Sequence, residues 1–371
     1  MIGCSIQMDN IIYQLMVKLP ILFYPIYIGE HFQNIYKNSF NKYPKIAFVT
    51  NDTILHLYEK FICNIKADFP QVFHVVIRDG EEHKNITTLT EIYQKLIAEK
   101  LSRDGLIVVF GGGVIGDLAG FVSATYMRGI DYVQIPTTLL AMVDSSIGGK
   151  TAINLPEGKN IVGSFHQPQA VFCDLHYLDT LSVREFNAGL MEVIKYGLIL
   201  DASFYNFIIQ KKEDIEKRNR DTIAYLIYRC CQLKAEIVAQ DEKEKGIRSI
   251  LNFGHTIGHA LESYTDYQYY LHGEAVSIGT LAIMNYLVER GILHSHVLKE
   301  LLDVLSFFQL PTSLPVDFKI DEIIENLWHD KKIRSNTIQW ITLKQIGVAN
   351  RGQSIDLKKI KKILRGLQGN G

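Results

Sequence analysis

The sequence lacks the cysteine pattern of a disulfide-rich protein or of a thiolate metal site. Its five cysteines are an odd number, no C-x-x-C spacing occurs, and Cys230 and Cys231 are adjacent. The sequence also has no run of about 18 apolar residues, and residues 1–20 lack a basic stretch followed by an apolar one. We therefore expect a cytoplasmic protein with reduced cysteines, no transmembrane helix and no signal peptide.

An excess of charge of either sign is absent as well. The 39 Lys and Arg residues nearly balance the 40 Asp and Glu residues, which gives a formal net charge of -1. A neutral chain has no broad positive field, so neither nucleic acid nor a membrane surface is expected as a partner. A local group of cations that binds one small anion remains compatible with this balance. The 371 residues, 47% of them hydrophobic, predict a globular protein of about two domains.

Short apolar strands alternate with helical stretches in the first half of the chain. Strands are predicted at 45–50, Val72–Ile77, 106–110 and 132–135, and a helix is predicted at 88–100. This alternation predicts a Rossmann-like α/β domain with a mostly parallel sheet over residues 1–180. Ligands of such sheets bind at the carboxyl ends of the strands, where this sequence has polar turns.

The second half has a helical pattern nearly throughout. Apolar residues recur at helical spacing, which predicts helices at 184–200, Arg220–Gln240, 250–264, 273–290, 296–308 and 357–367. We therefore expect an all-α domain over residues 181–371. The last of these helices is basic and amphipathic, and we interpret it as a solvated surface helix.

A glycine-rich turn follows the third predicted strand. Gly111, Gly113 and Gly116 fit the pattern G-x-G-x-x-G between a strand and a helix. Glycine allows backbone N–H groups to approach a phosphate closely, and the helix that follows adds the positive end of its dipole. The alternative is a tight turn that only packs the helix on the strand. Further polar turns at 79–84 and 137–138 favour a long cofactor lying across this edge of the sheet.

Three histidines and one carboxylate form a candidate metal site. His255 and His259 are spaced i and i+4 on a predicted helix, His272 precedes the next helix, and Glu192 lies in an apolar helical stretch. Three N and O ligands with an open position suit a catalytic zinc ion. The Glu of H-E-x-x-H is missing, which argues against a metalloprotease. Ordinary hydrogen-bonded helix histidines are the alternative interpretation.

Cations gather near these motifs despite the neutral net charge. Lysines stand among glycines at 144–151 and 158–160, and Lys195 is three residues after Glu192 in an otherwise apolar stretch. Such cations fit a small substrate with both a carboxylate and a phosphate. The other cations near the motifs are Arg128, Lys234, Arg248 and Lys331.

Together these segments resemble the 3-dehydroquinate synthase family. The resemblance covers nearly the whole chain after the first twenty-odd residues and is strongest over 79–274. It is carried by the strings GGGVIGDLAGF, YMRG, PTTLLAMVDSSIGGKTAIN, GKNIVGSFHQP, EVIKYG, LNFGHTIGHA and LHGEAV.

The resemblance implies a two-domain enzyme of the shikimate pathway that uses NAD and a divalent metal, Zn²⁺ or Co²⁺. The family cyclises 3-deoxy-D-arabino-heptulosonate 7-phosphate to 3-dehydroquinate and phosphate. Transient oxidation at C5 acidifies the C6 proton, phosphate is eliminated, the ketone is reduced again, and an aldol reaction closes the ring. The resemblance also implies a homodimer.

The resemblance assigns roles to individual residues. The metal ligands would be Glu192, His255 and His272. The NAD-binding positions would be Asp79, Gly80, Glu81, Glu82, His83, Lys84, Gly113, Val114, Ile115, Gly116, Asp117, Thr137, Thr138, Lys150, Lys159, Tyr177, Leu178, Asp179 and Thr180. Asp179 departs from the family pattern, in which lysine is frequent, and this weakens the assignment there.

The substrate would be held by a second set of residues. Asp144 and Lys195 would bind hydroxyl groups near the metal, and Lys234 and Arg248 would bind the carboxylate. The phosphate would be surrounded by Arg128, Lys150, Asn160, Asn252 and His259, together with Lys331 or its neighbour Lys332. His259 is thus expected to contact phosphate and relay a proton, not to act as a fourth metal ligand.

Other functions are compatible with parts of this pattern. A metal- and NAD-dependent polyol dehydrogenase would share the two-domain plan but would not need Lys234 and Arg248. A related sugar-phosphate cyclase would act on a neutral sugar phosphate. A nucleotide-binding module without activity would leave the second domain unexplained.

Overall fold

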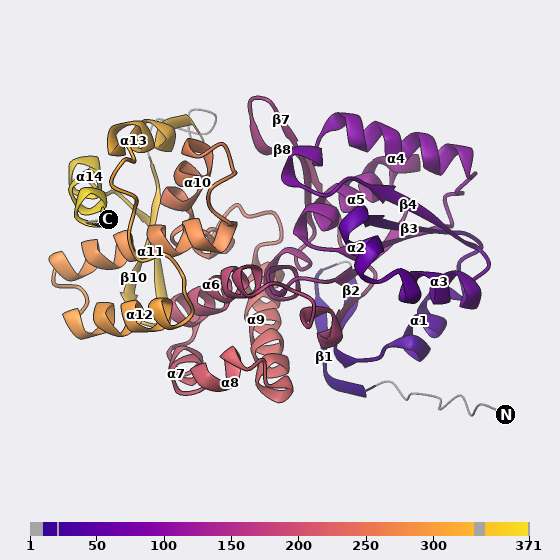
Figure 1. The fold of residues 1–371 in the computed structure, drawn as a ribbon, viewed down its shortest axis with the longest axis horizontal. Helices are drawn as coiled ribbons and strands as arrows, with labels where there is room; N and C mark the ends of the chain where they lie inside the picture. Colours follow the sequence, from indigo (N-terminus) through magenta and orange to yellow (C-terminus); the bar gives the residue numbers. More distant parts are fainter. Residues whose placement is uncertain (1–9, 21, 330–337, 370–371) are drawn as a thin grey trace. The chain divides into compact units, whose positions relative to one another are not determined.

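The computed structural model describes residues 10–20, 22–329 and 338–369. The chain divides into two compact units, and most of its helices and strands are labelled in Figure 1. The first unit consists of Met1–Leu181 and Ile223–Glu242, and the second of Ser182–Thr222 and Lys243–Gly371. The first unit therefore includes a helical segment that follows part of the second unit in the sequence.

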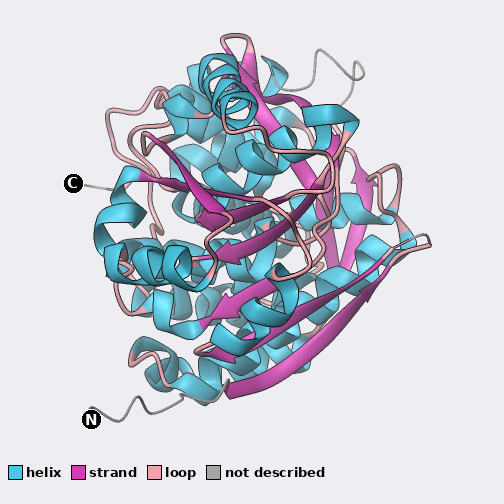
Figure 2. Cartoon of the chain, turned by 90° about the vertical axis from the view of Figure 1, so that its right-hand side faces the viewer, coloured by secondary structure: helices cyan, strands magenta, loops and turns pink. Residues whose placement is uncertain are grey.

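The first unit contains a seven-stranded sheet (Figure 2). Its strand order is β1-β2-β9-β6-β5-β3-β4; β1 and β2 are antiparallel, and the other neighbours are parallel. Every residue of β3 and β5 is buried, as expected of central parallel strands covered on both faces. The strands are β1 (Asn10–Lys18), β2 (Phe23–Glu30), β3 (Ile46–Asn51), β4 (Val72–Ile77), β5 (Leu106–Gly111), β6 (Asp131–Pro136) and β9 (Val171–Asp174).

Alternating side chains of the strands build a different core on each face of this sheet. Val49 and Val109 belong to an aliphatic core with Leu118 of helix α5. The adjacent Phe48 and Phe110 have their ring centroids 5.6 Å apart within an aromatic cluster. The helices of this unit are α1 (Gln33–Phe40), α2 (Asp52–Leu57), α3 (Glu59–Asp68), α4 (Ile86–Ala98), α5 (Gly113–Thr125) and most of α9 (Arg220–Gln240).

A two-stranded hairpin, β7 (Lys150–Leu155) with β8 (Gly158–Phe165), completes the first unit. The side-chain Oδ1 of Asn154 accepts a hydrogen bond from the backbone N–H of Asn160, 3.0 Å away. The backbone N–H of Asn154 in turn donates a hydrogen bond to the backbone carbonyl oxygen of Lys84 at 2.8 Å. The hairpin is thus attached to the turn that follows β4.

The second unit is mainly helical. Helix α11 is its central element, because nearly all of its residues before the last turn are buried. The helices are α6 (Val183–Leu200), α7 (Ala202–Gln210), α8 (Lys212–Glu216), α10 (His255–Tyr264), α11 (His272–Glu289), α12 (Ser295–Phe307), α13 (Ile320–His329) and α14 (Leu357–Gly366). A hairpin of β10 (Trp340–Gln345) and β11 (Val348–Gln353) belongs to the same unit.

The predicted fold class, a mostly parallel α/β domain together with a helical domain, is confirmed. The four predicted strands coincide with β3 to β6 to within one residue at each end, and the predicted helix 220–240 is α9. The β10–β11 hairpin corrects the expectation that the second half is entirely α. Strands β1, β2 and β9 were also not predicted, because β9 has only four residues and Pro25 interrupts the apolar pattern of β2.

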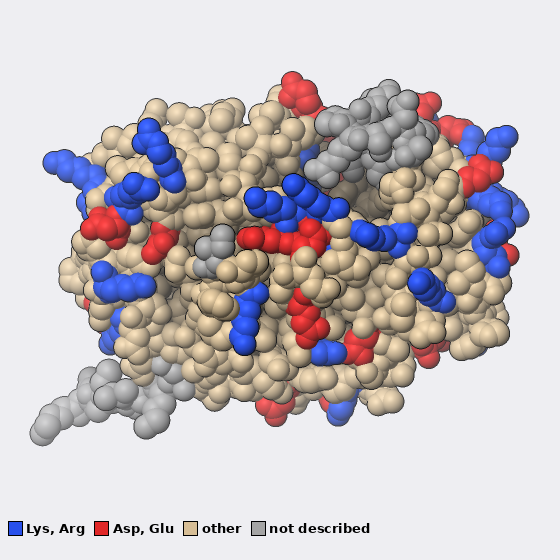
Figure 3. Space-filling model, turned by 180° about the vertical axis from the view of Figure 1, so that it is seen from behind, with Lys and Arg blue, Asp and Glu red and all other residues tan. Residues whose placement is uncertain are grey.

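The surface agrees with the charge balance of the sequence. Acidic and basic side chains are mixed over the face drawn in Figure 3. Within the described ranges, no helix combines the length and apolar character that crossing a bilayer requires.

Candidate functional site

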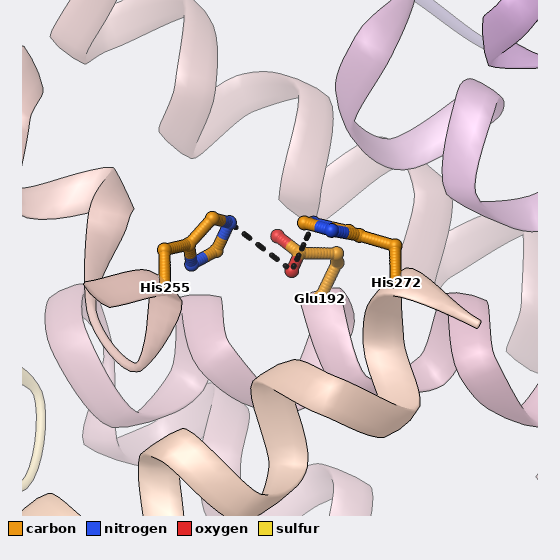
Figure 4. A group of neighbouring side chains, drawn as sticks. All are labelled: Glu192, His255 and His272. Atoms are coloured by element: carbon orange, nitrogen blue, oxygen red, sulfur yellow. Dashed lines mark ion pairs between the residues drawn. The ribbon is translucent and has the colours of Figure 1, made fainter. Parts of the chain in front are cut away.

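Glu192, His255 and His272 come together in the second unit (Figure 4). Glu192 lies on α6, whereas His255 and His272 are the first residues of α10 and α11. Glu192 Oε1 is 3.7 Å from His255 Nε2 and 3.8 Å from His272 Nε2. One ligand atom from each residue lies within 4.8 Å of the others. Three residues far apart in the sequence therefore present one oxygen and two nitrogens to a common point.

Glycines allow the helices to approach closely enough to form this group. A Cβ on Gly273 would overlap the carbonyl oxygen of Ala188, so α11 begins against the backbone of α6. Gly254 precedes α10 with a φ of +77°, a left-handed conformation that favours glycine. Its backbone lies against α11, where a Cβ would overlap Thr280. Close backbone contact thus brings the first residues of α10 and α11 near Glu192.

The environment of Glu192 fits a bound cation. Its side chain is fully buried, and neither carboxylate oxygen has a hydrogen-bond donor with suitable geometry among the described residues. The buried Lys195, one turn later, forms an ion pair with Oε2. A buried carboxylate is costly unless it is paired or binds a metal. A divalent cation between Oε1 and the two imidazoles would satisfy the remaining oxygen, and this donor set suits Zn²⁺ or Co²⁺.

The pKa values of the two histidines are shifted in opposite directions. Burial, assisted by the positive charge of Lys195, lowers the pKa of His255 well below its ordinary value. Its Nδ1 lies 2.9 Å from the carbonyl oxygen of Phe253, which can only accept, so the proton is on Nδ1 and Nε2 carries the lone pair. Burial also lowers the pKa of His272, but Glu262 and Glu192 outweigh this effect, and the net shift is upward. His255 is therefore ready to bind a metal at neutral pH.

The other predicted residues of the second unit lie on η5 (Ile247–Asn252) and α10. Arg248 is buried, and Asn252 donates a hydrogen bond from Nδ2 to Glu244 Oε1 at 2.8 Å. His259 is exposed, and its ring centroid is 5.4 Å from that of His255. His259 forms a second group of nearby ligand atoms with Glu262 and His272. Lys331 and Lys332 lie outside the described residues.

The glycine turn of the first unit leads into helix α5. Gly112 is the N-cap residue of α5. Because glycine has no side chain, Gly112 leaves the backbone amides of the first turn without a side-chain cap. A Cβ on Gly113 would lie 3.1 Å from Ser145 Oγ, and one on Gly116 would lie 3.1 Å from Gln134 Oε1. The glycines thus serve close packing around a helix N-terminus, which is a suitable site for a phosphate. Thr137, on the neighbouring strand end, is buried, and its Oγ1 has no hydrogen-bond partner among the described residues.

Polar residues meet at the neighbouring strand ends. Asn51, at the end of β3, donates a hydrogen bond from Nδ2 to Asp79 Oδ1 at 2.6 Å. The buried Lys84 donates from Nζ to Asp117 Oδ2 at 2.5 Å and to Asn160 Oδ1 at 2.6 Å. Burial raises the pKa of Asp117, although Lys84 opposes this shift. The predicted residues Asp79, Lys84 and Asp117 are therefore fixed by partners at the edge where the sheet would bind a ligand.

The other predicted residues of the turn after β4 lie in or beside the short helix η1 (Glu81–His83). Glu81 Oε1 is 3.6 Å from Lys159 Nζ and accepts a hydrogen bond from Asn154 at 2.8 Å. Gly80 has a φ of +117°, which requires glycine. Glu82 is exposed and lies 3.8 Å from His83 Nε2.

Two predicted substrate residues of the first unit contact each other. Lys234, on α9, forms an ion pair with Asp144 Oδ1 and donates to the carbonyl of Asp144 at 2.8 Å. By contrast, Lys150 and Arg128 are exposed. The backbone at Arg128 is left-handed, with a φ of +68°, in the turn before β6.

The four predicted positions 177–180 fall into two classes. Tyr177 and Leu178 are buried in the core, so their side chains are not available to a cofactor. Asp179 and Thr180 are exposed. Tyr58 donates a hydrogen bond to the carbonyl oxygen of Tyr177 at 3.1 Å, which fixes this turn.

Prediction from the sequence missed Asn51 and Glu262. Asn51 was not among the predicted site residues, although it is a polar residue at the end of a buried strand. Glu262 is a buried carboxylate in an apolar helix, which is the same signal that identified Glu192. Applied to every carboxylate of the helical half, that criterion would have found it.

Solved structures with the same fold define the class of protein. A 2-deoxy-scyllo-inosose synthase complexed with carbaglucose-6-phosphate, NAD⁺ and Co²⁺ has a TM-score of 0.87 at 24% identity, over 95% of this chain and 99% of that one. The 2-epi-5-epi-valiolone synthase from Streptomyces hygroscopicus subsp. jinggangensis 5008, with NAD⁺ and Zn²⁺ bound, has a TM-score of 0.86 at 26% identity, over 94% and 98%. An iron-containing alcohol dehydrogenase from Thermotoga maritima has a TM-score of 0.66 at 17% identity, over 95% and 98%. The fold is thus one that cyclases and metal-containing dehydrogenases share.

Sequence comparison narrows this class to one family. The family model for the 3-dehydroquinate synthase N-terminal region matches residues 74–188, and the model for the C-terminal region matches residues 189–333. The 3-dehydroquinate synthase of Shewanella loihica is 42% identical over 91% of this chain and 94% of that protein. The 3-dehydroquinate synthase of Shewanella sp. (strain MR-4) is 41% identical over the same shares. The chain belongs to the 3-dehydroquinate synthase family, which confirms the resemblance seen in its motifs.

Proposed function

We propose that this protein is a 3-dehydroquinate synthase, a carbon–oxygen lyase of the shikimate pathway. It would convert 3-deoxy-D-arabino-heptulosonate 7-phosphate to 3-dehydroquinate and phosphate. The observation that carries the proposal is the group of the buried Glu192 and His255 with the partly exposed His272, formed by three helices in a chain of this family. Membership of the family indicates the substrate, and the group would form the metal site that the reaction needs.

The two units would have separate tasks in this reaction. In the second unit, Glu192, His255 and His272 would hold Zn²⁺ or Co²⁺. In the first unit, the turn at 111–117 and the polar strand ends at 79–84 and 137–138 would hold NAD⁺. When bound, NAD⁺ would exchange a hydride at C5 and the metal would polarise the oxygen there. The cofactors of the two cyclases with this fold support the assignment.

The side chains of this protein would bind and orient the substrate. Lys195 carries a positive charge beside Glu192 and would donate a hydrogen bond to a substrate hydroxyl, as Asp144 would accept one. Lys234 and Arg248 would bind the carboxylate. The substrate phosphate would be bound by Arg128, Lys150, Asn160, Asn252, His259 and Lys331 or Lys332, and it would accept the C6 proton itself.

Release of inorganic phosphate tests this proposal directly. Purified protein would be mixed with NAD⁺, Co²⁺ or Zn²⁺ and the seven-carbon keto acid phosphate, and phosphate would be measured over time. We expect catalytic release without net accumulation of NADH, because the hydride returns to the substrate. No release beside an active control enzyme would overturn the proposal. Accumulation of NADH would instead indicate a dehydrogenase.

Replacing Lys234 with alanine tests the carboxylate site. We expect the KM for the keto acid phosphate to rise about 10- to 150-fold, because a hydrogen bond to a charged group contributes about 1.5–3 kcal/mol. Binding of NAD⁺, measured by calorimetry, should stay close to that of the unchanged protein.

The exposed Lys243 provides a matched control for Lys234. Lys243→Ala should leave the KM unchanged, since this lysine is nine residues away on the surface. Equal activity of Lys234→Ala and the unchanged protein would contradict the carboxylate role and favour an enzyme that acts on a neutral substrate.

We propose further that the protein acts as a homodimer in the cytoplasm. Its family supports the dimer. Arg128 supports it as well, because this exposed cation lies in a left-handed turn from which it would reach a second copy of the chain. A sedimentation velocity measurement that finds only monomer at micromolar concentration would contradict the dimer.

A further inference from the structure

We propose that Glu262 is a positioning residue that fixes the imidazole of His272 for metal binding. The proposal rests on the metal site proposed above and does not depend on the choice of substrate. Glu262 is buried on α10, and its Oε1 lies 3.5 Å from His272 Nδ1. His272 therefore has one carboxylate facing each ring nitrogen, Glu192 at Nε2 and Glu262 at Nδ1.

Both His255 and His272 need a hydrogen-bond acceptor at the ring nitrogen that does not bind the metal. A neutral imidazole binds a metal through one nitrogen and carries a proton on the other, so an acceptor at the second nitrogen selects the tautomer. For His255 the acceptor is the backbone carbonyl of Phe253, at 2.9 Å from Nδ1. For His272 the acceptor at Nδ1 is the side chain of Glu262.

The exposure of the two rings makes this partner more important for His272. The side chain of His272 is 28% exposed, whereas that of His255 is 9% exposed. The ring of His272 is thus less confined by packing, and an ion pair with a buried carboxylate restricts its rotation. A carboxylate at Nδ1 also makes Nε2 a stronger electron donor to a metal.

The helix geometry places Glu262 where this role requires it. His255 and Glu262 are seven residues apart on α10, which is two turns, so both lie on one face of the helix. α10 thereby presents a ligand from its first turn and a supporting carboxylate from a later turn. Buried carboxylates need a partner, and the imidazole of His272 supplies one.

A second role for Glu262 is geometrically conceivable but chemically weaker. Glu262, His259 and His272 form another group of nearby ligand atoms. His272 would then have to use Nδ1 for that metal while Nε2 faces Glu192, and a neutral imidazole has only one lone pair to offer. The arrangement therefore favours Glu262 as the acceptor for the Nδ1 proton over Glu262 as a metal ligand.

Metal binding by Glu262→Gln and Glu262→Ala tests the proposal. Affinity for Co²⁺ would be measured by competition with a chromogenic chelator, and the visible spectrum of bound Co²⁺ would report its ligands. We expect Glu262→Ala to weaken binding about 10- to 100-fold, as is typical for the partner of a metal-bound histidine, with one Co²⁺ still bound and its band pattern retained. Glu262→Gln should lose less affinity, because its amide oxygen still accepts a hydrogen bond.

Thermal unfolding without metal separates positioning from a purely structural role. The isosteric Glu262→Gln should unfold near the temperature of the unchanged metal-free protein, while the stabilisation by added Co²⁺ should shrink. Glu289→Gln, at an exposed position near the end of α11, is the matched control and should change neither quantity.

Three results would overturn the proposal. Unchanged Co²⁺ affinity in both Glu262 variants would refute the positioning role while leaving the metal site intact. A changed Co²⁺ spectrum, with an affinity loss equal to that of a ligand variant, would show that Glu262 binds the metal itself. Absence of Co²⁺ binding by the unchanged protein would refute the metal site as well.

Discussion

The variant Glu192→Gln is expected to lose divalent metal binding and, with it, phosphate release. Glutamine keeps the shape of the side chain but removes the charge of the single oxygen donor in the candidate group. The buried Lys195 would then lose its ion pair with Glu192, which destabilises the folded protein further. Replacing a hydrogen-bond partner of a metal ligand lowers metal affinity by at most about 100-fold. Because Glu192 would be a ligand itself, we expect the Co²⁺ affinity of Glu192→Gln to fall by more than this. Competition with a chelator measures this loss.

An exposed glutamate provides the control for this prediction. Glu213 lies on α8, and Glu213→Gln should retain full metal content and activity. Both variants would be dialysed against the same Co²⁺ concentration, and their metal content would be determined by atomic emission. One equivalent of tightly bound metal in Glu192→Gln would show that the site lies elsewhere.

The variant Gly273→Ala is expected to be strongly destabilised and to bind metal weakly. The added methyl group would overlap the carbonyl oxygen of Ala188, and both partners of this contact belong to helix backbones. No side-chain rotation can relieve such an overlap, so α11 would have to move away from α6. Overpacking of this kind lowers the free energy of unfolding by about 1–3 kcal/mol. Because two backbones are in contact here, we expect the loss for Gly273→Ala to lie at the upper end of this range. Urea denaturation with and without Co²⁺ measures both effects.

Gly366 offers a matched comparison within the same unit. A Cβ at Gly366, the last residue of α14, would meet no heavy atom within 4 Å. Gly366→Ala should therefore leave the free energy of unfolding unchanged or raise it by up to about 1 kcal/mol, because alanine restricts the unfolded chain. If Gly273→Ala were as stable as Gly366→Ala and bound Co²⁺ normally, the close approach of α6 and α11 would not control the site.

The sequence contains enough local information to predict the central strands and the main helices. β5 and the first four residues of β3 are continuous apolar runs, and α9 carries an apolar stripe, so the hydrophobic pattern alone predicts these elements. The hairpin β10–β11 could not be predicted in this way. Its strand β11 has no buried residue to set an alternating pattern.

The candidate site, too, could be predicted from the sequence only in part. Residue type and spacing identified Glu192, His255 and His272, but their proximity depends on backbone contacts at Gly254 and Gly273 that no local pattern reveals. Glu262 carries the same local signal as Glu192, a carboxylate in an apolar helix, but the role proposed for it depends on its partner His272, ten residues later on another helix. The pair of Lys234 and Asp144 likewise joins residues that are 90 positions apart.

The division of the chain into units has a consequence for exchange between homologous genes. The chain passes from one unit to the other three times, after Leu181, Thr222 and Glu242. The two family models meet between residues 188 and 189, so a recombination there would join Met1–Leu181 to a foreign segment Ile223–Glu242. The chimera would then take Asp144 from one parent and Lys234 from the other. Two crossovers flanking α9, not one at the border of the family models, would be needed to inherit the first unit whole.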